Sequence, residues 1–296
     1  MNVNEERYVV QPNAISRAAY MMPTMARRLI FLSILNVQIE RPKGMKIEIP
    51  LQEISRQLGY VATKRYGELK NAINIASKQV LRFENDDGSF TEWMPWLTYC
   101  SLDLNTKVVT FHINEYLYDY VLNIRQASGF SILMQQEYLK LESRYSYRWF
   151  EIIMSRAGHM GKSREFYVKY KISDLKTLFA LDGNKYGKTN NFKVNVIEKP
   201  IEELNEKGLG FCLSLEYAYK GNRLEEVTLR CALDDQGDIG SAAYWMLTRP
   251  KEFARCLAQA KRSLGMQGQN TSKAYELECI HKAIELLKAK AVEHEQ

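Results

Sequence analysis

Residues 189–207 of the chain read Thr189-Asn-Asn-Phe-Lys-Val-Asn-Val-Ile-Glu-Lys-Pro-Ile-Glu-Glu-Leu-Asn-Glu-Lys207, and their pattern predicts an amphipathic helix. The buried stripe of this helix is expected to hold Phe192, either Val196 or Ile197, Ile201 and Leu204. The segment Asp182-Gly183-Asn184 predicts a turn just before it. A shorter helix with Ser173 as its N-cap is expected to end at about Leu181. Two helices joined by a glycine-containing turn are typical of a helix-turn-helix unit.

Strands are predicted on both sides of this helix pair. Residues 166–171 alternate apolar and polar side chains before it, and residues 211–219 and 224–233 follow it around the turn Gly221-Asn222. A long helix over 135–156 precedes the first strand, and its predicted buried stripe is Tyr138, Leu141, Tyr145, Trp149 and Ile152. A helix-turn-helix followed by a β-hairpin is the winged-helix arrangement, which is therefore predicted for residues 126–233.

The same order of elements is predicted upstream. A helical stretch is predicted over 12–40 and restarts at Pro23. A strand at 45–50, a short helix at 51–58 and a longer helix at 63–80 follow it. Three strands are then predicted, at 81–83, 90–101 and 107–113. We therefore expect an α+β fold with two tandem winged-helix domains, at 1–125 and 126–233, each a helix-turn-helix plus β-hairpin. The linker between them is expected at 125–131. Residues 234–296 predict a helical C-terminal extension of unknown role.

Two features of the first domain are interpreted from the pattern alone. Arg27 and Arg28 are adjacent on a predicted amphipathic helix, and we expect both on its solvated side. A run of aromatic residues in the predicted strands is interpreted as sheet core, with burial in a dimer as the alternative, and it comprises Phe90, Trp93, Trp96 and Tyr99.

Composition favours a globular protein with clustered positive charge. The chain has 296 residues, 46% hydrophobic residues and a formal net charge of +6, which is too small to hold nucleic acid by bulk attraction. Residues 126–233 are the most basic third. No two of the five cysteines have Cys-x-x-Cys spacing, which argues against a disulfide framework or a structural zinc site. No signal peptide and no membrane span are predicted, so we expect a cytoplasmic protein.

The side of the 189–207 helix opposite its apolar stripe supplies the candidate DNA contacts. Asparagine bonds adenine and lysine bonds guanine in the major groove, so the base-reading candidates are Asn190, Asn191, Lys193 and Asn195. Thr189 begins the helix and belongs to the same set. Phosphate contacts are expected from Lys185, Tyr186 and Lys188. In the first domain the candidates are Lys64, Arg65, Lys70 and Asn71. An ordinary solvated helix face is the alternative for every member.

Three stretches resemble one known family, the initiator proteins of iteron plasmids. They are Tyr138-Leu-Lys-Leu-Glu-Ser-Arg-Tyr-Ser-Tyr-Arg-Trp-Phe-Glu151, Ile172-Ser-Asp-Leu-Lys-Thr-Leu-Phe179 and Asn191-Phe-Lys-Val-Asn-Val-Ile-Glu-Lys-Pro-Ile-Glu-Glu-Leu-Asn205. The resemblance lies in the second domain; the first domain matches more loosely. Val194 and Asn195 stand where family members often have two basic residues, so the DNA sequence that is read does not carry over.

The resemblance implies a plasmid replication initiator without cofactor or catalytic activity. Such a protein binds double-stranded origin DNA at repeated elements, the iterons, and helps to open the origin. It recruits the host replication initiator and the replicative helicase, and as a dimer it represses its own gene. The second domain is expected to recognise the iteron, and the first to contact the DNA backbone or to form the dimer.

Two other classes of function remain open on sequence grounds. A transcriptional regulator could use the same two domains without a role in replication. A DNA-nicking enzyme would need a pair of metal-binding histidines near a tyrosine, but His112, His159, His281 and His294 lie far apart in sequence. Gly161-Lys162-Ser163 resembles the end of a phosphate-binding loop, but Arg156 occupies the position of its first glycine. No metal site is predicted.

Overall fold

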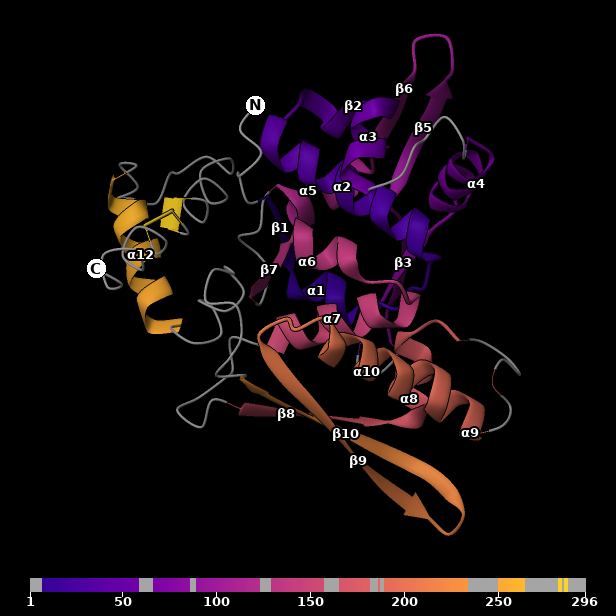
Figure 1. The fold of residues 1–296 in the computed structure, drawn as a ribbon. Coiled ribbons are helices and arrows are strands. Elements are labelled where there is room, and N and C mark those ends of the chain that lie inside the picture. The colour runs from indigo at the N-terminus through magenta and orange to yellow at the C-terminus, as the bar shows by residue number, and fades with distance from the viewer. Residues whose placement is uncertain are drawn as a thin grey trace.

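The computed structural model places most of the chain in helices and short antiparallel sheets (Figure 1). The residues that it describes are 7–58, 66–85, 89–122, 129–156, 165–181, 186, 189–233, 250–263, 282–283 and 285–286. Among these residues, no helix has the length and apolar character needed to span a membrane.

The second half of the chain forms a winged helix over a three-stranded sheet. Its elements are α7 (Arg144–Arg156), β8 (Glu165–Lys171), α8 (Ile172–Leu178), α9 (Thr189–Phe192), the π-helix η6 (Lys193–Glu198), α10 (Lys199–Glu206), β9 (Phe211–Lys220) and β10 (Arg223–Leu233). The strand order is β8-β10-β9, with both pairs antiparallel. Helices lie on one side of this sheet (Figure 1). Exposed residues such as Tyr167 and Lys169 alternate with buried ones along β8.

The first half repeats this topology and adds a hairpin. Its elements are α2 (Thr24–Glu40), the 3-10 helix η1 (Lys43–Met45), β2 (Lys46–Pro50), α3 (Leu51–Leu58), α4 (Tyr66–Ala76), β3 (Val80–Glu84), β4 (Thr91–Pro95), β5 (Leu97–Asp103) and β6 (Val108–Ile113). The strand order β2-β6-β5 matches β8-β10-β9, because in each unit the first strand pairs with the last. Strands β3 and β4 form a separate pair. The predicted architectural repeat is therefore confirmed.

A strand from the start of the first half pairs with a strand from its end. The elements concerned are β1 (Tyr8–Pro12), α1 (Asn13–Arg17), η3 (Glu115–Leu117), α5 (Tyr118–Val121), β7 (Phe130–Met134) and α6 (Gln135–Lys140). β1 pairs with β7 in antiparallel register from Tyr8↔Met134 to Pro12↔Phe130. The linker predicted at 125–131 is therefore wrong at its end, because β7 begins at Phe130 and its apolar side chains are buried. The domain division at residue 125 stays a prediction.

The helix predicted over 135–156 is two helices. α6 ends at Lys140 and α7 begins at Arg144, with the three residues between them outside any helix. Every member of the predicted apolar stripe is nevertheless buried, from Tyr138 to Ile152. A second local prediction also fails, since α8 begins at Ile172 with Lys171 in the cap position. The Ser173 hydroxyl donates to the Asp174 carboxylate instead of capping the helix.

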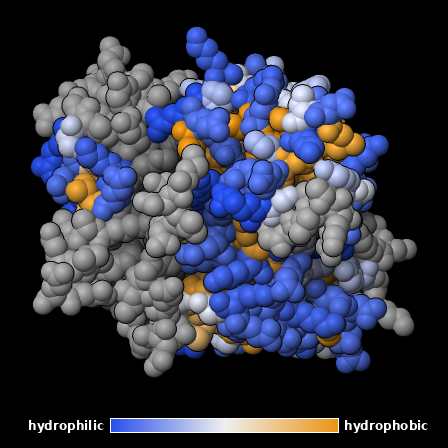
Figure 2. All heavy atoms as spheres, turned by 45° about the horizontal axis from the view of Figure 1, so that its top comes forward, coloured by the Kyte–Doolittle hydropathy of each residue, from blue (hydrophilic) through white to orange (hydrophobic). Residues whose placement is uncertain are grey.

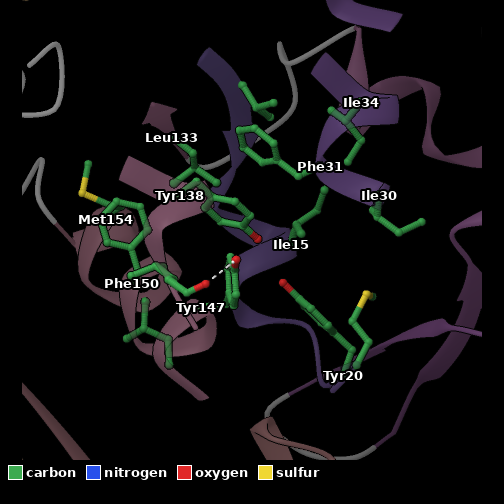
Figure 3. Close-up of a cluster of buried hydrophobic side chains, with 14 of the residues drawn as sticks. Ile15, Tyr20, Ile30, Phe31, Ile34, Leu133, Tyr138, Tyr147, Phe150 and Met154 are labelled. Atoms are coloured by element: carbon green, nitrogen blue, oxygen red, sulfur yellow. Dashed lines mark hydrogen bonds between the residues drawn. The ribbon is translucent and has the colours of Figure 1, made fainter. Parts of the chain in front are cut away.

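Aromatic side chains from α2, α6 and α7 form a shared core (Figure 3). Phe31 stacks on Tyr138 with ring centroids 4.2 Å apart, and Tyr147 meets Tyr138 edge-on at 4.7 Å. Tyr20 points its hydroxyl toward the same region from the other side. Because α2 and α7 are far apart in the sequence, this core joins distant segments of the chain.

A buried ionic cluster lies beside these rings. Glu151 on α7 is fully buried, and Arg27 and Arg148 are 4% and 1% exposed. The Glu151 carboxylate forms ion pairs with both guanidinium groups and accepts hydrogen bonds from the hydroxyls of Tyr20 and Tyr138. Arg148 also donates to the carbonyl oxygens of Ser16 and Ala18. Burial lowers the pKa of Arg148.

The expectation that Arg27 is solvated is therefore wrong. A buried charge is stable only when it is paired and hydrogen-bonded. Glu151, which lies 124 positions along the chain from Arg27, provides this pairing. Arg28, the next residue, is half-buried and donates to the Tyr147 hydroxyl and to two backbone carbonyls. Neither arginine is on a solvated surface, because their partners come from distant segments.

One helix is described in the C-terminal extension, α12 (Pro250–Ser263), as predicted for this region. Cys256 and Ala260 are buried on it and Arg262 is exposed. Most other residues of the predicted extension lie outside the described residues.

We expect Glu151→Gln to lower the free energy of unfolding by about 3–5 kcal/mol, because it leaves two buried guanidinium groups without a counter-charge. Urea denaturation of the full chain measures this change. Glu53→Gln is the control, since Glu53 pairs with Arg56 at the surface and its loss should cost less than about 1 kcal/mol. Equal losses in the two variants would contradict a structural role for the buried cluster.

Candidate nucleic-acid interface

The predicted recognition helix runs from Thr189 to Glu206, but its winding changes along the way. Between α9 and α10 the backbone is π-helical, and the Lys199 N–H bonds the Val194 carbonyl five residues back. Pro200 provides the reason, because proline has no N–H and its ring collides with the carbonyl four residues back, here Val196, in a regular α-helix. The predicted extent is thus close to correct, and regular winding throughout is wrong.

Trp149 on α7 compensates for the donor that Pro200 lacks. Its indole Nε1–H donates to the Val196 carbonyl oxygen at 2.8 Å. The indole ring is fully buried and meets Phe179 and Tyr170 edge-on, with centroid distances of 5.6 and 6.4 Å. The recognition helix is therefore fixed to α7 at the residue whose ordinary backbone partner is missing.

A carboxylate makes a second connection between the same two helices. Glu203 on α10 accepts hydrogen bonds from the backbone N–H groups of Glu142 and Ser143, at 2.6 and 3.1 Å, and from the Ser146 hydroxyl at 2.7 Å. These groups lie at the start of α7, where unpaired N–H groups favour a negative charge. Glu203 and Trp149 together hold the recognition helix against α7 along most of its length.

The first turn of the recognition helix is open to solvent. Thr189, Asn190 and Asn191 are exposed, whereas Phe192 is buried against the core. The side chains of these three residues project from one end of the helix. They fit the predicted base-reading surface, since a recognition helix presents its N-terminal residues to the major groove.

Lys193 and Asn195 are engaged within the protein. The Lys193 ammonium lies 3.3 Å from a Glu198 carboxylate oxygen and 4.3 Å from the centroid of the Tyr217 ring. Burial lowers the pKa of Lys193, but hydrogen bonds to Glu198 and Tyr219 outweigh it and raise the pKa overall. Asn195 donates from Nδ2 to the Asn191 carbonyl at 2.9 Å. These contacts compete with base contacts, although each side chain keeps further donors.

Tyr186 is a packed residue next to the recognition helix. Its hydroxyl lies 2.8 Å from the Tyr145 hydroxyl, and its ring meets Phe192 edge-on at 6.2 Å. Burial and this hydrogen bond raise the pKa of Tyr145 to about 12. Tyr186 therefore supports the helix in the structure, and its hydroxyl can donate to a phosphate only while Tyr145 donates to Tyr186. Lys185 and Lys188, predicted beside it, lie outside the described residues.

In the first unit, α4 occupies the position of the recognition helix. Lys70 and Asn71 are exposed on it, on the side opposite buried Leu69 and Ile73. Asn74 is exposed on the same side and was not singled out, although its position four residues after Lys70 marks it as a neighbour. Lys64 and Arg65 lie outside the described residues.

The tip of the β9–β10 hairpin carries further basic side chains that the sequence analysis did not single out. Lys220 and Arg223 are exposed on either side of Gly221, and Tyr219 is 53% exposed. Gly221 has a φ of +60°, which glycine adopts without steric cost. The turn itself was predicted, and the basic residues on both sides of it were the sequence signal for a candidate phosphate contact.

Large apolar side chains are exposed mainly on the first unit. On the face seen in Figure 2, hydrophobic residues gather in the upper part. The exposed large side chains of the first unit include Phe90, Trp93 and Tyr99. Trp96 is buried, so the interpretation of the aromatic run as sheet core holds for Trp96 and is wrong for the other three. Within the described part of the chain, no group of His, Cys, Asp or Glu side chains is arranged to hold a metal ion.

Removing the Glu203 carboxylate should loosen the recognition helix from α7. We expect Glu203→Ala to lower the free energy of unfolding by about 1–3 kcal/mol, because three donors at the start of α7 lose their acceptor. Thermal and urea unfolding measure the change. Glu202→Ala, the exposed neighbour on the same helix, should be close to neutral. Similar losses in both variants would mean that helix propensity, and not the cap, accounts for the effect.

Comparisons with known proteins give the same two-unit arrangement. Among solved structures, the chain is similar to the Pi initiator protein in its crystal structure with iteron DNA, at 16% identity and a TM-score of 0.57, over 79% of this chain and 100% of that one. It also matches domains 2 and 3 of RctB at 11% identity and a TM-score of 0.43, over 78% of this chain and 93% of that one. At these identities the likeness to Pi is one of fold. No curated protein sequence matches.

Two family models match consecutive parts of the chain. The model described as Initiator Replication protein, WH1 matches residues 8–154, and the model described as Initiator Rep protein, WH2 matches residues 171–231. The first match includes β7, α6 and nearly all of α7, and the second runs from the end of β8 into β10. Together they cover well over half of the 296 residues, so the chain belongs to the family of replication initiator proteins with two winged-helix domains.

Proposed function

We propose that this protein initiates plasmid replication by binding repeated origin sequences in double-stranded DNA. The observation that carries the proposal is the recognition helix, whose first turn is exposed while Trp149 and Glu203 fix the rest of it. A rigidly held helix with projecting asparagines suits base recognition in the major groove. The Pi initiator, which has the same fold, was crystallised with iteron DNA.

The proposed surface combines two kinds of contact. Asn190 and Asn191 read base edges, whereas Lys70 on α4 and the hairpin-tip residues Lys220 and Arg223 contact phosphates. Thr189 contributes at the start of the helix. Lys193 and Asn195 have partners within the protein that compete with DNA, so we propose them as secondary contacts. The predicted contacts at Lys64, Arg65, Lys185, Tyr186 and Lys188 remain part of the proposal.

The decisive experiment is footprinting of the full chain on the DNA next to its own gene. We expect protection of several direct repeats that fill one after another as protein is added, and loss of plasmid maintenance when the repeats are deleted. Occupancy of one inverted repeat with no effect on copy number would instead identify a transcriptional regulator.

Two substitutions separate base reading from phosphate contact. Asn191→Ala should reduce discrimination at one base pair by about 1–3 kcal/mol, because a bidentate base contact is lost. Lys70→Ala should weaken binding to all sequences alike and lower the slope of log affinity against log salt by about one unit. Titrations at several salt concentrations, on repeat and scrambled duplexes, measure both effects. Equal weakening on every duplex by Asn191→Ala would mean that Asn191 reads no base.

We further propose that the protein acts by binding and opening DNA rather than by cutting it. Supercoiled origin DNA incubated with the protein and a divalent metal should stay unnicked, and a covalent tyrosine–DNA adduct would overturn this. On the family resemblance we also propose contacts with the host initiator and replicative helicase, and dimers that repress the gene. Sedimentation over a range of concentrations, with and without repeat DNA, tests for the dimer.

A further inference from the structure

The buried residues of the recognition helix form two stripes that do not line up. Phe192 and Ile201 are both buried but are nine positions apart, and a regular α-helix would place them about 180° apart around its axis. Ile197, Ile201 and Leu204 follow one regular stripe, and Phe192 and Val196 follow another. If one turn of the helix contains an extra residue, the two stripes come to lie on the same side. The π-helix η6, whose backbone hydrogen bonds span five residues instead of four, contains this extra residue.

The middle of the helix also lacks one of the backbone hydrogen bonds of a regular α-helix. Residue 200 is the regular donor to the Val196 carbonyl, and Pro200 cannot donate. Helices bend where such a bond is missing, so the exposed turn at 189–191 is joined to α10 through a weak point. The orientation of that turn then depends on whatever holds the Val196 carbonyl.

Trp149 is the group that holds it. Its indole N–H occupies the place of the missing donor, and its ring is held between Phe179, just after α8, and Tyr170 on β8. The residues next to it on α7 are themselves fixed, since Arg148 and Glu151 belong to the buried ionic cluster. The indole is therefore a fixed point from which the position of Val196 is set.

We infer that Trp149 is a positioning residue for DNA recognition: its indole N–H replaces the backbone donor lost at Pro200 and so orients the first turn of the recognition helix, with Asn190 and Asn191, toward the bases. This inference rests on the proposed function. It assigns to one buried hydrogen bond a role in specificity beyond its contribution to stability.

The test removes the N–H in two ways, with a smaller aromatic ring and with an isosteric bicyclic ring that keeps the packing. Trp149→Phe is compared with wild type on a duplex carrying the footprinted repeat, on duplexes with single base changes opposite the helix, and on a scrambled duplex. We expect discrimination between the repeat and its single-base variants to fall by about tenfold, while affinity for the scrambled duplex stays unchanged. Benzothienylalanine at position 149, which keeps the bicyclic shape without the N–H, should act in the same way if Trp149→Phe folds poorly.

A matched control and a rescue variant separate positioning from general stability. Trp96→Phe truncates another buried tryptophan, whose indole nitrogen has no hydrogen-bond partner among the described residues, and should leave discrimination intact. Pro200→Ala returns a backbone N–H to the helix, so the double variant Trp149→Phe/Pro200→Ala should regain most of the lost discrimination. Loss of discrimination in Trp96→Phe, or no rescue in the double variant, would overturn the inference.

Hydrogen exchange judges the inference independently of DNA. Amides of residues 189–198 should exchange faster in Trp149→Phe than in wild type, with those of α2 and the β9–β10 hairpin unchanged, and the double variant should restore protection. If wild type shows no preference for the repeat, the proposed function fails, and unchanged exchange in Trp149→Phe then also removes the positioning role. If wild type discriminates and Trp149→Phe discriminates equally, only the inference fails.

Discussion

The buried Glu151 carboxylate is the interaction on which the packing of α7 against α1 and α2 depends. It neutralises Arg27 on α2 and Arg148 on its own helix, and it accepts hydrogen bonds from two tyrosine hydroxyls. Such a cluster contributes little net stability compared with an apolar core, but it is costly to break, because each unpaired charge would remain in a medium of low dielectric constant. It therefore favours one way of docking α2 and α1 on α7.

Helix α7 contacts two different parts of the molecule through neighbouring residues. Arg148 and Glu151 face α1 and α2, and Trp149 between them faces the recognition helix. Since one residue turns the helix by about 100°, consecutive side chains reach different neighbours. The placement of the exposed helix turn is thus tied through one rigid element to the placement of α1 and α2.

Local patterns predicted a large part of the fold and some of the candidate site. The period of apolar residues located both helix pairs, and the turn residues located the hairpins, because these signals arise within a few residues. The exposed positions of Asn190, Asn191 and Lys70 followed from the same periodicity. The burial of Arg27 was missed since its partner Glu151 is far away in sequence. The strand β7 was missed because its pairing partner, β1, lies at the other end of the first unit.

The sequence by itself determined the repeated order of helix, strand, helix pair and hairpin, because periodicity and turn chemistry are properties of neighbouring residues. It also held the information for the π-helix, in the offset between Phe192 and Ile201 and in Pro200. Only the tertiary structure decided which groups stabilise the helix at this irregularity, since the indole of Trp149 and the carboxylate of Glu203 act across helices. Their long-range hydrogen bonds decide how the recognition helix is held, and no local pattern specifies them.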